Sequence, residues 1–343
     1  MGCGCNSPEW IVGMHNIGLR NIPRVSGKLS FRDRLGALRM RLGIGRMKYS
    51  VPPGLYTIGT PDENSDVFVT ANYKLSFDKL RESLDGISAW ILVLDTKGIN
   101  VWCAAGKGTF GTDELTGRIL RTGLAKIVMH RKLILPQLGA VGVSAYQVTK
   151  AAGFKIAYGP VLARDIPGYI ANGYEKTPEM REVKFGFIDR LILTPIELKA
   201  ALIPLLIGLA VYLTVASLRS GVFKAEFLIG FLPFLGALIT GAVLVPVLLP
   251  FIPGKAFSLK GSIAGLLWAG ASIWIFRPDF WTSLIYFLTI PAISAFLAMN
   301  FTGASTFTTL SGVKLEVRIV TPFAAVLCAA SLALGILQTV NVI

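Results

Sequence analysis

The sequence predicts a protein of two parts, a Rossmann-like α/β domain followed by an all-α transmembrane domain of about five helices. Two observations carry this prediction: strand-like and helix-like segments alternate in the first half, and long uncharged apolar runs fill the second. Of the 34 lysines and arginines, only seven lie beyond Lys199. We therefore expect a basic N-terminal segment over 1–52, an α/β domain over 53–195 and a membrane domain over 196–343.

The first half of the chain alternates between strand-like and helix-like segments. Strands are expected at 66–71, 89–95, 133–135 and 155–158, and helices at 77–84, 112–130 and 144–151, the second helix beginning at Thr112 as N-cap. This alternation predicts a parallel sheet with helices on both faces. Ligands of such sheets bind beyond the carboxyl ends of the strands. Thr70 and the segments 97–111, 137–142 and 159–163 should therefore meet around one crevice.

Five apolar runs in the second half approach the length of a membrane-spanning helix, which is about 20 residues. They cover 200–218, 227–252, 262–276, 281–301 and 322–343, and none contains Asp, Glu, Lys or Arg. Transporters usually carry ionisable residues within their spans, so this absence argues against ion coupling. The hydroxyl-rich loop 300–312 is either a polar site or an ordinary interfacial loop.

The distribution of cations predicts the orientation of the membrane domain. No secretory signal pattern is present at the N-terminus. Lysine and arginine are retained on the cytoplasmic side, and the basic half of the chain ends with Arg181, Lys184 and Arg190. We therefore expect a multi-pass protein of the cytoplasmic (inner) membrane with its N-terminal domain in the cytoplasm.

The segment 20–48 forms a basic amphipathic stretch. It holds nine cations against the single acid Asp33, and Phe31, Leu35, Leu38 and Leu42 recur at helical spacing before Gly43. Such a helix packs on its own domain, lies on anionic lipid or docks an acidic partner, and the pattern does not distinguish these alternatives. Nucleic acid is not an expected partner, because the domain is tied to a membrane.

The four cysteines are Cys3, Cys5, Cys103 and Cys328. Their number and spacing do not favour a disulfide framework, a zinc site or an iron–sulfur cluster. Cys3 and Cys5 lie in a frayed terminus or bind a soft metal. Cys328 lies in an apolar run and is expected to be a packing residue.

Cys103 lies within the stretch NVWCAAGKGTFG at 100–111. A phosphate-binding loop requires Gly-x4-Gly-Lys-Ser/Thr, but Val101 and Gly108 occupy two of its defining positions. A cysteine–histidine pair requires a nearby imidazole, which the positions of the two histidines do not provide. Lys107 and the following helix N-terminus would favour a thiolate. A single soft ligand suits a metal whose other positions are filled by a macrocycle.

The segment Asn100-Val-Trp-Cys-Ala-Ala-Gly-Lys107 resembles the signature of the mercury-methylating corrinoid proteins. That family joins a small α/β corrinoid domain to a C-terminal membrane domain of about five helices. The first half also resembles the corrinoid domain of the corrinoid iron–sulfur protein of the acetyl-CoA pathway, through KGTFG (107–111), LPQLG (135–139) and YGP (158–160). The Asp-x-His-x-x-Gly motif of methionine-synthase-type corrinoid proteins is absent, because Val128 precedes His130 by two positions.

The resemblance implies a Rossmann-like corrinoid-binding domain with a cobalt-containing cofactor, cobalamin or a relative, and no iron–sulfur cluster in this chain. It makes Cys103 the catalytic residue and the lower axial ligand of the cobalt. The other residues that it implies as contacts of the corrin are Thr70, Ala71, Asn100, Val101, Trp102, Ala104, Gly106, Gly139, Gly159 and Ala163.

The activity implied by this resemblance is a methyltransferase that passes a methyl group from cobalt to Hg(II) and forms methylmercury. A strongly donating thiolate would help the methyl group leave as a carbanion equivalent. The implied partners are a ferredoxin-like electron donor with two [4Fe–4S] clusters, an upstream methyl donor such as a methylated folate, and membrane lipid. The basic stretch 20–48 is a candidate docking face for the electron donor.

Two alternatives stay open on the residues alone. One is a corrinoid methyl carrier of one-carbon metabolism with an acceptor other than mercury. The other is a membrane transport or binding protein with a cytoplasmic sensing domain, which the five apolar runs would equally suit. Failure to bind a corrinoid would favour the second alternative.

Overall fold

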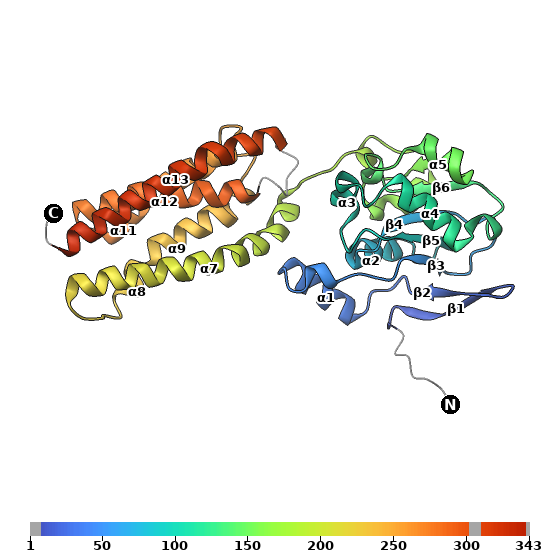
Figure 1. Ribbon diagram of the computed structural model, residues 1–343, viewed down its shortest axis with the longest axis horizontal. Coiled ribbons are helices and arrows are strands. Elements are labelled where there is room, and N and C mark those ends of the chain that lie inside the picture. Colours follow the sequence, from blue (N-terminus) through green and yellow to red (C-terminus); the bar gives the residue numbers. More distant parts are fainter. Residues whose placement is uncertain (1–7, 302–309, 341–343) are drawn as a thin grey trace, which may run out of the picture. The chain divides into compact units, whose positions relative to one another are not determined.

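The computed structural model describes residues 8–301 and 310–340. The chain forms two compact units (Figure 1): one comprises the residues up to 40 together with 44–183, and the other comprises 41–43 together with 184–343. The first unit is built on a β-sheet and the second on long helices. Cys3, Cys5 and most of the loop 300–312 lie outside the described residues.

A seven-stranded mixed sheet forms the centre of the first unit. In spatial order its strands are β1 (Ile11–Ile17), β2 (Arg20–Val25), β3 (Gly54–Ile58), β5 (Ala89–Leu94), β4 (Val67–Ala71), β6 (Lys132–Leu135) and β7 (Lys155–Tyr158). The last four in this order are parallel, whereas β3 is antiparallel to β5 and β1 is antiparallel to β2. The predicted parallel sheet is therefore correct for four strands and wrong for the sheet as a whole.

The sequence pattern does not reveal the three strands that precede β4. β1 and β2 form a hairpin that turns at Gly18, where φ is 55°. Its first strand alternates between half-buried and exposed residues, as expected for a ribbon at the edge of a sheet, and cations along β2 hide its strand character. β2 pairs in parallel with β3, so the segment 1–52 contributes two strands to the same sheet.

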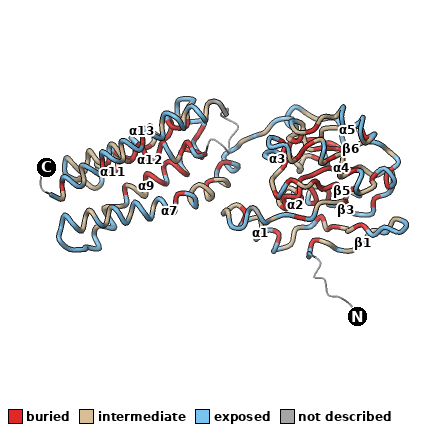
Figure 2. The backbone as a smooth tube through the Cα atoms, viewed as in Figure 1, coloured by how far each residue is buried: buried red, intermediate tan, exposed pale blue. Residues whose placement is uncertain are grey.

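Helices cover both faces of the sheet, as predicted. One face carries α3 (Val101–Lys107), α4 (Thr112–Thr122) and α5 (Ala145–Ala152), and the other carries α2 (Lys74–Ser83) and α6 (Ile166–Ala171). Strand residues alternate between the two cores: Val67 and Val69 face the first, and Phe68 faces the second. Figure 2 shows the buried sheet between these layers.

The structure differs from the prediction around the cysteine motif. The segment 101–107, which is predicted as part of a loop, is helix α3. Helix α4 ends at Thr122 instead of near His130, because Gly123 adopts a left-handed φ of 60° and a 3-10 turn, η2 (Leu124–Lys126), follows. Its N-cap is Gly111, and the Thr112 hydroxyl instead accepts a hydrogen bond from the backbone N–H of Ser144 at 2.9 Å.

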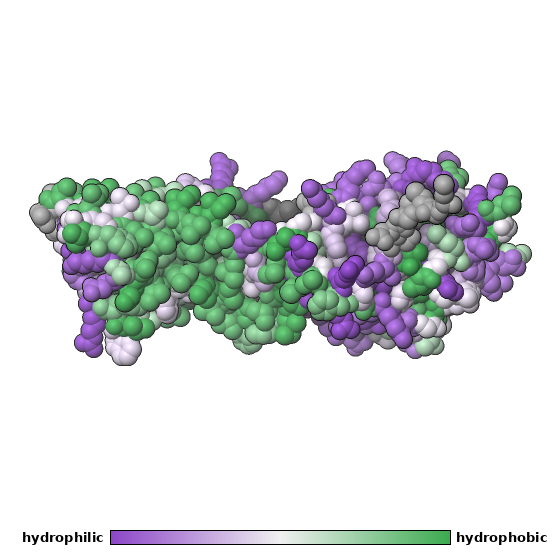
Figure 3. Space-filling model, turned by 90° about the horizontal axis from the view of Figure 1, so that it is seen from below, coloured by the Kyte–Doolittle hydropathy of each residue, from purple (hydrophilic) through white to green (hydrophobic). Residues whose placement is uncertain are grey.

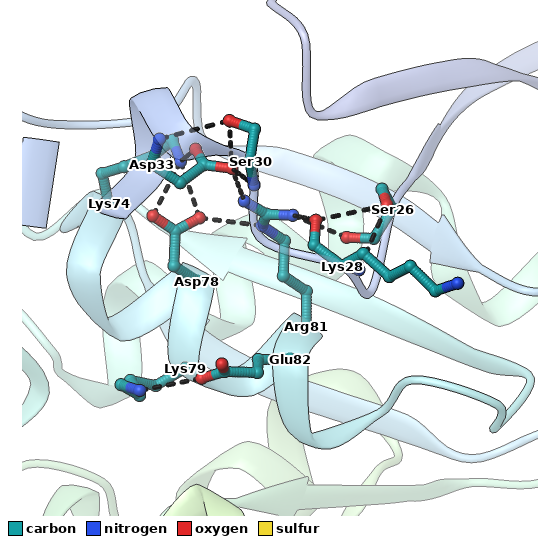
Figure 4. Close-up of polar contacts among 9 residues, drawn as sticks. All are labelled: Ser26, Lys28, Ser30, Asp33, Lys74, Asp78, Lys79, Arg81 and Glu82. Atoms are coloured by element: carbon teal, nitrogen blue, oxygen red, sulfur yellow. Dashed lines mark hydrogen bonds and ion pairs between the residues drawn. The ribbon is translucent and has the colours of Figure 1, made fainter. Parts of the chain in front are cut away.

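Helix α1 (Phe31–Arg41) is confirmed with nearly the predicted bounds, and Gly43 beyond it has a φ of 70°. A buried ion cluster joins α1 to α2 (Figure 4). Lys74 donates to Asp33 at 2.7 Å and to Asp78 at 2.6 Å, and Arg81 donates to the same two carboxylates at 2.7 and 2.8 Å. All four residues are buried, so two acids and two bases neutralise one another inside the domain.

The ion cluster also fixes the ionisation of Asp33. Burial raises the pKa of the Asp33 carboxyl, but hydrogen bonds from Lys74, Ser30 and Arg81 outweigh burial and hold that pKa well below its usual range. Arg81 further donates to the carbonyls of Ser26 and Lys28, at 2.7 and 3.1 Å. The cluster therefore ties the chain between β2 and α1 to α2.

The second unit contains five helices long and apolar enough to cross a membrane, among the residues that the structure describes. They span Phe187–Ser220, Phe227–Val247, Phe257–Phe276, Phe280–Asn300 and Gly312–Thr339. The first of these is α7, the third is α11 and the fourth is α12, and the fifth belongs to α13 (Leu310–Thr339). The second is divided into α8 (Phe227–Gly230), α9 (Leu232–Ile239), the π-helical segment η6 (Thr240–Leu244) and α10 (Val245–Val247). Apolar side chains dominate the surface of this unit (Figure 3).

Several helices of this unit extend beyond the predicted apolar runs and include charged residues. Lys260, in the first turn of α11, is buried and donates to the carbonyls of Leu249, at 2.7 Å, and Ile252. Arg190 of α7 is also buried and donates to the carbonyl of Val247 at 3.0 Å. Their charged groups are satisfied by backbone carbonyls where neighbouring helices end, which explains why these cations are tolerated beside apolar segments.

Candidate functional site

The four parallel strands β5, β4, β6 and β7 end at one edge of the sheet, as the sequence predicts. The segments that leave this edge are 72–73, 95–100, 136–144 and 159–162, and the second leads directly into α3. Within α/β sheets this edge is the usual ligand-binding position. Cys103 lies on α3, the helix that directly follows the carboxyl end of β5.

Asn72 orders the loop that connects β5 to α3. It is buried immediately after β4, and its side-chain oxygen accepts hydrogen bonds from the N–H of Thr96 at 3.0 Å, the hydroxyl of Thr96 at 2.8 Å and the N–H of Gly98 at 3.0 Å. The loop also contains Lys97, a non-glycine residue with a φ of 58°. Such strain persists only where surrounding contacts enforce it, so Asn72 is a positioning residue that sequence reasoning misses.

Helix α3 begins with a conventional cap. The side-chain oxygen of Asn100 accepts a hydrogen bond from the backbone N–H of Cys103 at 2.9 Å, and this satisfies one of the free donors of the first helical turn. The resemblance to corrinoid proteins implies Asn100 as a residue of the site, and this backbone contact fixes the start of the helix that carries Cys103.

The side chains of α3 divide between the core and the surface. Val101, Ala104 and Ala105 are buried against the sheet, whereas Cys103 is exposed and Trp102 is 43% exposed. The thiol and the indole therefore lie on a surface that the rest of the described chain leaves open. Val141, which is 83% exposed in the segment after β6, adds a further apolar group. Trp102 and Val141 are thus accessible to solvent and are not committed to the core.

A close packing contact holds α3 against the segment that follows β6. Phe110 is fully buried, and a Cβ atom at Gly139 would approach its ring to 2.5 Å. A Cβ atom at Gly142 would lie 2.2 Å from the carbonyl oxygen of Phe110 and 3.1 Å from the Cα atom of Ala105. Glycine at both positions is therefore required for this approach, and Gly142 is a second residue that the motif analysis does not identify.

We expect Gly142→Ala to destabilise the α/β domain by about 1–3 kcal/mol, because the added methyl group has no space beside a buried backbone. The matched control is Gly106→Ala on α3, where a Cβ atom would meet nothing within 4 Å; there alanine should be neutral or stabilising by up to about 1 kcal/mol. Urea-dependent hydrogen exchange of the buried β5 amides would measure both. Equal effects of the two substitutions would contradict the close-packing argument.

The remaining predicted contact residues lie at or near the same edge. Thr70 and Ala71 are the buried last residues of β4. Gly159 directly follows β7 and donates its N–H to the carbonyl of Leu135 at 2.8 Å. Ala163 begins the 3-10 turn η4 (Ala163–Asp165) and packs with the core on the α2 face of the sheet. The structure thus brings Gly139 and the α3 residues together directly, whereas Ala163 packs on the opposite face.

Charged residues lie in the loop before α3 and in the facing part of α4. A hydrogen bond from Lys97 is the main cause that lowers the pKa of Asp95, and the reciprocal contact raises the pKa of Lys97; the two charged groups are 2.8 Å apart. Glu114 of α4 accepts from the N–H of Asp95 at 2.9 Å and pairs with Arg118 at 2.7 Å. These contacts connect the loop before α3 to the first turn of α4.

The structure does not support either role considered for a histidine, as the partner of a nucleophilic cysteine or as part of a corrinoid-binding motif. His130 lies before β6, at the edge opposite to α3, and its Nε2 atom is 2.9 Å from the carbonyl oxygen of Ser65. Among residues 8–301 and 310–340, no group of three or more His, Cys, Asp and Glu side chains is arranged to hold a metal ion. Within that part of the chain, the exposed thiol of Cys103 is thus not a member of such a group.

Part of the α/β domain is similar to subunits of one enzyme complex. Residues 41–169 match the family model of the CO dehydrogenase/acetyl-CoA synthase delta subunit. The gamma subunit of the acetyl-CoA decarbonylase/synthase complex of Methanocaldococcus jannaschii is 32% identical over 133 residues, which are 38% of this chain and 27% of that protein. The corresponding subunit of Methanopyrus kandleri is 33% identical over 127 residues, 36% of this chain and 27% of that protein.

A third relative, the gamma subunit from Archaeoglobus fulgidus, is 30% identical over 131 residues. The chain spans about a quarter (27%) of the length of these relatives. These findings overturn the expected membership of the mercury-methylating family, because the family model and the curated relatives name the acetyl-CoA complex instead. The KGTFG, LPQLG and YGP stretches, which suggested the acetyl-CoA pathway, all lie within the matched residues 41–169.

Proposed function

We propose that this chain is a membrane-anchored corrinoid protein that carries methyl groups in one-carbon metabolism, with Cys103 as the lower axial ligand of cobalt. The single observation that carries the proposal is the exposed Cys103 thiol on α3, at the carboxyl edge of the parallel strands. This helix lies inside the segment 41–169, which is similar to subunits of the acetyl-CoA decarbonylase/synthase complex. The role is of the methyltransferase type.

The residues present around Cys103 fit a planar macrocycle whose metal takes one ligand from the protein. A thiolate is a soft ligand suited to a transition metal. Trp102, next to Cys103 on α3, is an exposed aromatic group, and Val141 in the segment after β6 is an exposed apolar group. Gly106 leaves open space above its Cα atom. No competing cluster of metal ligands occurs among residues 8–301 and 310–340. When bound, a corrinoid supplies a cobalt centre that accepts and releases a methyl group.

The protein's own contribution is to hold the thiol in a fixed position. Asn100 caps α3 through the Cys103 N–H, Asn72 holds the loop before α3, and Phe110 packs α3 against Gly139 and Gly142. Thr70, Ala71, Gly159 and Ala163 are proposed contacts of the cofactor rim. Held in this way, Cys103 would present its thiolate to a bound corrinoid in one orientation, and the groups behind the ligand would tune the metal.

The location and partners belong to the same proposal. The five helices of spanning length support an anchor in the cytoplasmic membrane, with the basic α/β domain on the cytoplasmic side. The relatives are subunits of a multi-subunit complex, which supports partner proteins for this chain as well. We propose that these include a ferredoxin-like electron donor with two [4Fe–4S] clusters and a methyl-donor system that supplies a methylated folate.

We expect the full-length protein, purified anoxically in detergent, to bind about one hydroxocobalamin per chain. Cobalt content after desalting, together with the visible spectrum, measures this binding, and circular dichroism confirms that the protein is folded. A folded protein that retains no cobalt would overturn the proposal. A loaded protein that passes its methyl group to Hg(II), and to no carbon- or thiol-based acceptor, would contradict the one-carbon assignment.

One observation supports a second candidate, a membrane-embedded binding protein. A largely apolar cavity of about 980 Å³ lies within the helical unit, between α7, α9, α12 and α13. Tyr212, Phe234 and Tyr286 line the cavity. Thr289 lines it as well, and its buried hydroxyl has no hydrogen-bond partner. Its volume is within the range of small-molecule sites. A protein that binds no corrinoid but retains an apolar small molecule through purification would favour this candidate.

A further inference from the structure

Helix α1 presents an apolar row and several cations away from its own domain. Phe31, Leu35 and Leu38 are 79%, 43% and 52% exposed. Three arginines on the same helix, Arg32, Arg34 and Arg39, are exposed as well. The sequence leaves three alternatives for this helix, and the exposure of its apolar row excludes the simplest one, in which the row packs on the helix's own domain.

The residues of α1 occupy distinct sectors around its axis. At roughly 100° per residue, Leu35 and Leu38 fall within about 40° of Phe31 and form a narrow apolar stripe. Arg32 and Arg39 lie about 80–100° to one side of Phe31, and Arg34 lies about 60° to the other. Arginines therefore flank the apolar stripe on both sides. Asp33 and Met40, the buried residues of the helix, lie on the face opposite to the stripe.

The single acidic residue of α1 does not weaken the positive charge of its outer surface. Asp33 points into the domain and is paired with Lys74 and Arg81 (Figure 4). The cluster neutralises this carboxylate and fixes the rotation of the helix about its axis. Arg32 forms an ion pair with Glu9 at 2.7 Å. The pair is solvent-exposed, with side chains 80% and 51% accessible, so it adds little stability.

We propose that α1 lies on an anionic lipid surface, with Phe31, Leu35 and Leu38 inserted at the level of the headgroups and the flanking arginines paired with lipid phosphates. A narrow apolar stripe between two rows of cations is the arrangement of helices that lie in the membrane interface. Arginine stems are apolar and their guanidinium groups reach the headgroups. The inference does not depend on the cofactor.

A bilayer is favoured over an acidic protein as the occupant of this surface because of the rest of the chain. The second unit contains five helices long enough to span a membrane. A bilayer that holds these helices stays at high effective concentration near α1, so even weak interfacial binding is populated. The attraction to an anionic leaflet then adds to the apolar contacts, at roughly a fivefold gain in association for each arginine.

The test uses the full-length protein in two sets of nanodiscs, one of phosphatidylcholine and one that also contains phosphatidylglycerol. Hydrogen–deuterium exchange of peptides over 31–42 reports whether α1 is covered. We expect exchange in this segment to be slower in the anionic nanodiscs, and the difference to shrink at about 1 M salt, where charge interactions are screened beyond about 3 Å.

Matched variants separate the apolar contribution to lipid binding from the electrostatic contribution. Leu35→Ser/Leu38→Ser should abolish the protection in both lipids, and Arg34→Gln/Arg39→Gln should remove its dependence on phosphatidylglycerol. Leu120→Ser is the apolar control, because Leu120 is 66% exposed on α4, and Lys126→Gln/Lys150→Gln is the charge control at exposed positions. Neither control should alter exchange over 31–42.

Two results would overturn the proposal. One is equal exchange over 31–42 in the two lipids, unaffected by the leucine and arginine variants. The other is protection that appears only when a soluble [4Fe–4S] ferredoxin is added and that the arginine variants remove. The second result would assign α1 to an acidic protein partner in place of lipid.

Discussion

Cys103→Ala is expected to shift the cobalt(III) absorption bands of the hydroxocobalamin-loaded protein and to lower methyl transfer by about 100-fold or more. Loss of a group that supports a metal ligand typically costs about 10–100-fold, and loss of the ligand itself should cost at least as much. The fold should survive, because the thiol is exposed and alanine is the best helix former. The Asn100 cap is retained, since it binds the backbone N–H of residue 103.

The matched control is Cys328→Ala, which removes a half-buried thiol from α13 and should leave the spectrum unchanged. Spectra are recorded anoxically on both variants at equal cobalt content. If the spectra of the wild type and of Cys103→Ala coincide while both proteins retain cobalt, Cys103 does not ligate the metal. The proposed role of α3 would then have to be abandoned, although corrinoid binding itself would stand.

The sequence predicts the parts of the fold that depend on local pattern. β5 is a continuous apolar run and β4 is apolar except for Thr70, and the structure buries every residue of both strands. Helix α3 escapes prediction because it is only seven residues long and contains Gly106, so tertiary packing decides its conformation. β1 and β2 escape because an edge hairpin buries few residues and leaves little hydrophobic signal in a cationic segment.

In the candidate site, too, residues that belong to a local pattern can be predicted, and residues that act through long-range contacts cannot. Cys103, Asn100 and the strand ends can be located from the motif and from the rule for parallel sheets. Asn72 cannot, because its function is to bond Thr96 and Gly98, more than twenty residues later. Contacts of this kind depend on how strands pair, and a single sequence does not encode strand pairing in any local pattern.

The burial of the ion cluster also depends on residues far apart in the sequence. Lys74, Asp78 and Arg81 recur at positions i, i+4 and i+7 of α2, a pattern typical of a solvated helix face. In the structure this face is covered by α1, whose Asp33 completes the cluster from 41 residues earlier in the chain. Because the charges are buried, the cluster is the position at which a single substitution should have the largest effect on stability.

Arg81→Met is expected to lower the free energy of unfolding of the α/β domain by about 3–5 kcal/mol. Removing one partner of a buried ion pair leaves an uncompensated buried charge, and here Asp33 and Asp78 each lose a donor. The carbonyls of Ser26 and Lys28 lose their hydrogen bonds to Arg81 as well. Native-state hydrogen exchange of the β5 amides in the full-length protein measures the loss.

The control for this prediction lies on the same helix. Lys79→Met removes an exposed partner of Glu82, in a pair whose side chains are 56% and 44% accessible, and it should cost no more than about 1 kcal/mol. Asp33→Asn in the Arg81→Met background should cost less than Asp33→Asn alone, because the two residues share one interaction. Additive effects of the two substitutions would show that Asp33 and Arg81 are not coupled.

The dependence of this loss on pH follows from the ionisation of Asp33. Burial raises its pKa, but hydrogen bonds from Lys74, Ser30 and Arg81 lower the pKa in the folded protein to well below its usual range. A carboxyl whose folded pKa is depressed stabilises the protein above its unfolded pKa of about 3.9, and this stabilisation is lost as the pH falls toward the folded pKa. The advantage of the wild type over Arg81→Met should therefore be constant near neutral pH and narrow below about pH 4. An advantage that widens on acidification would mean that Arg81 does not lower the pKa of Asp33, and the proposed stabilisation of the carboxylate would be wrong.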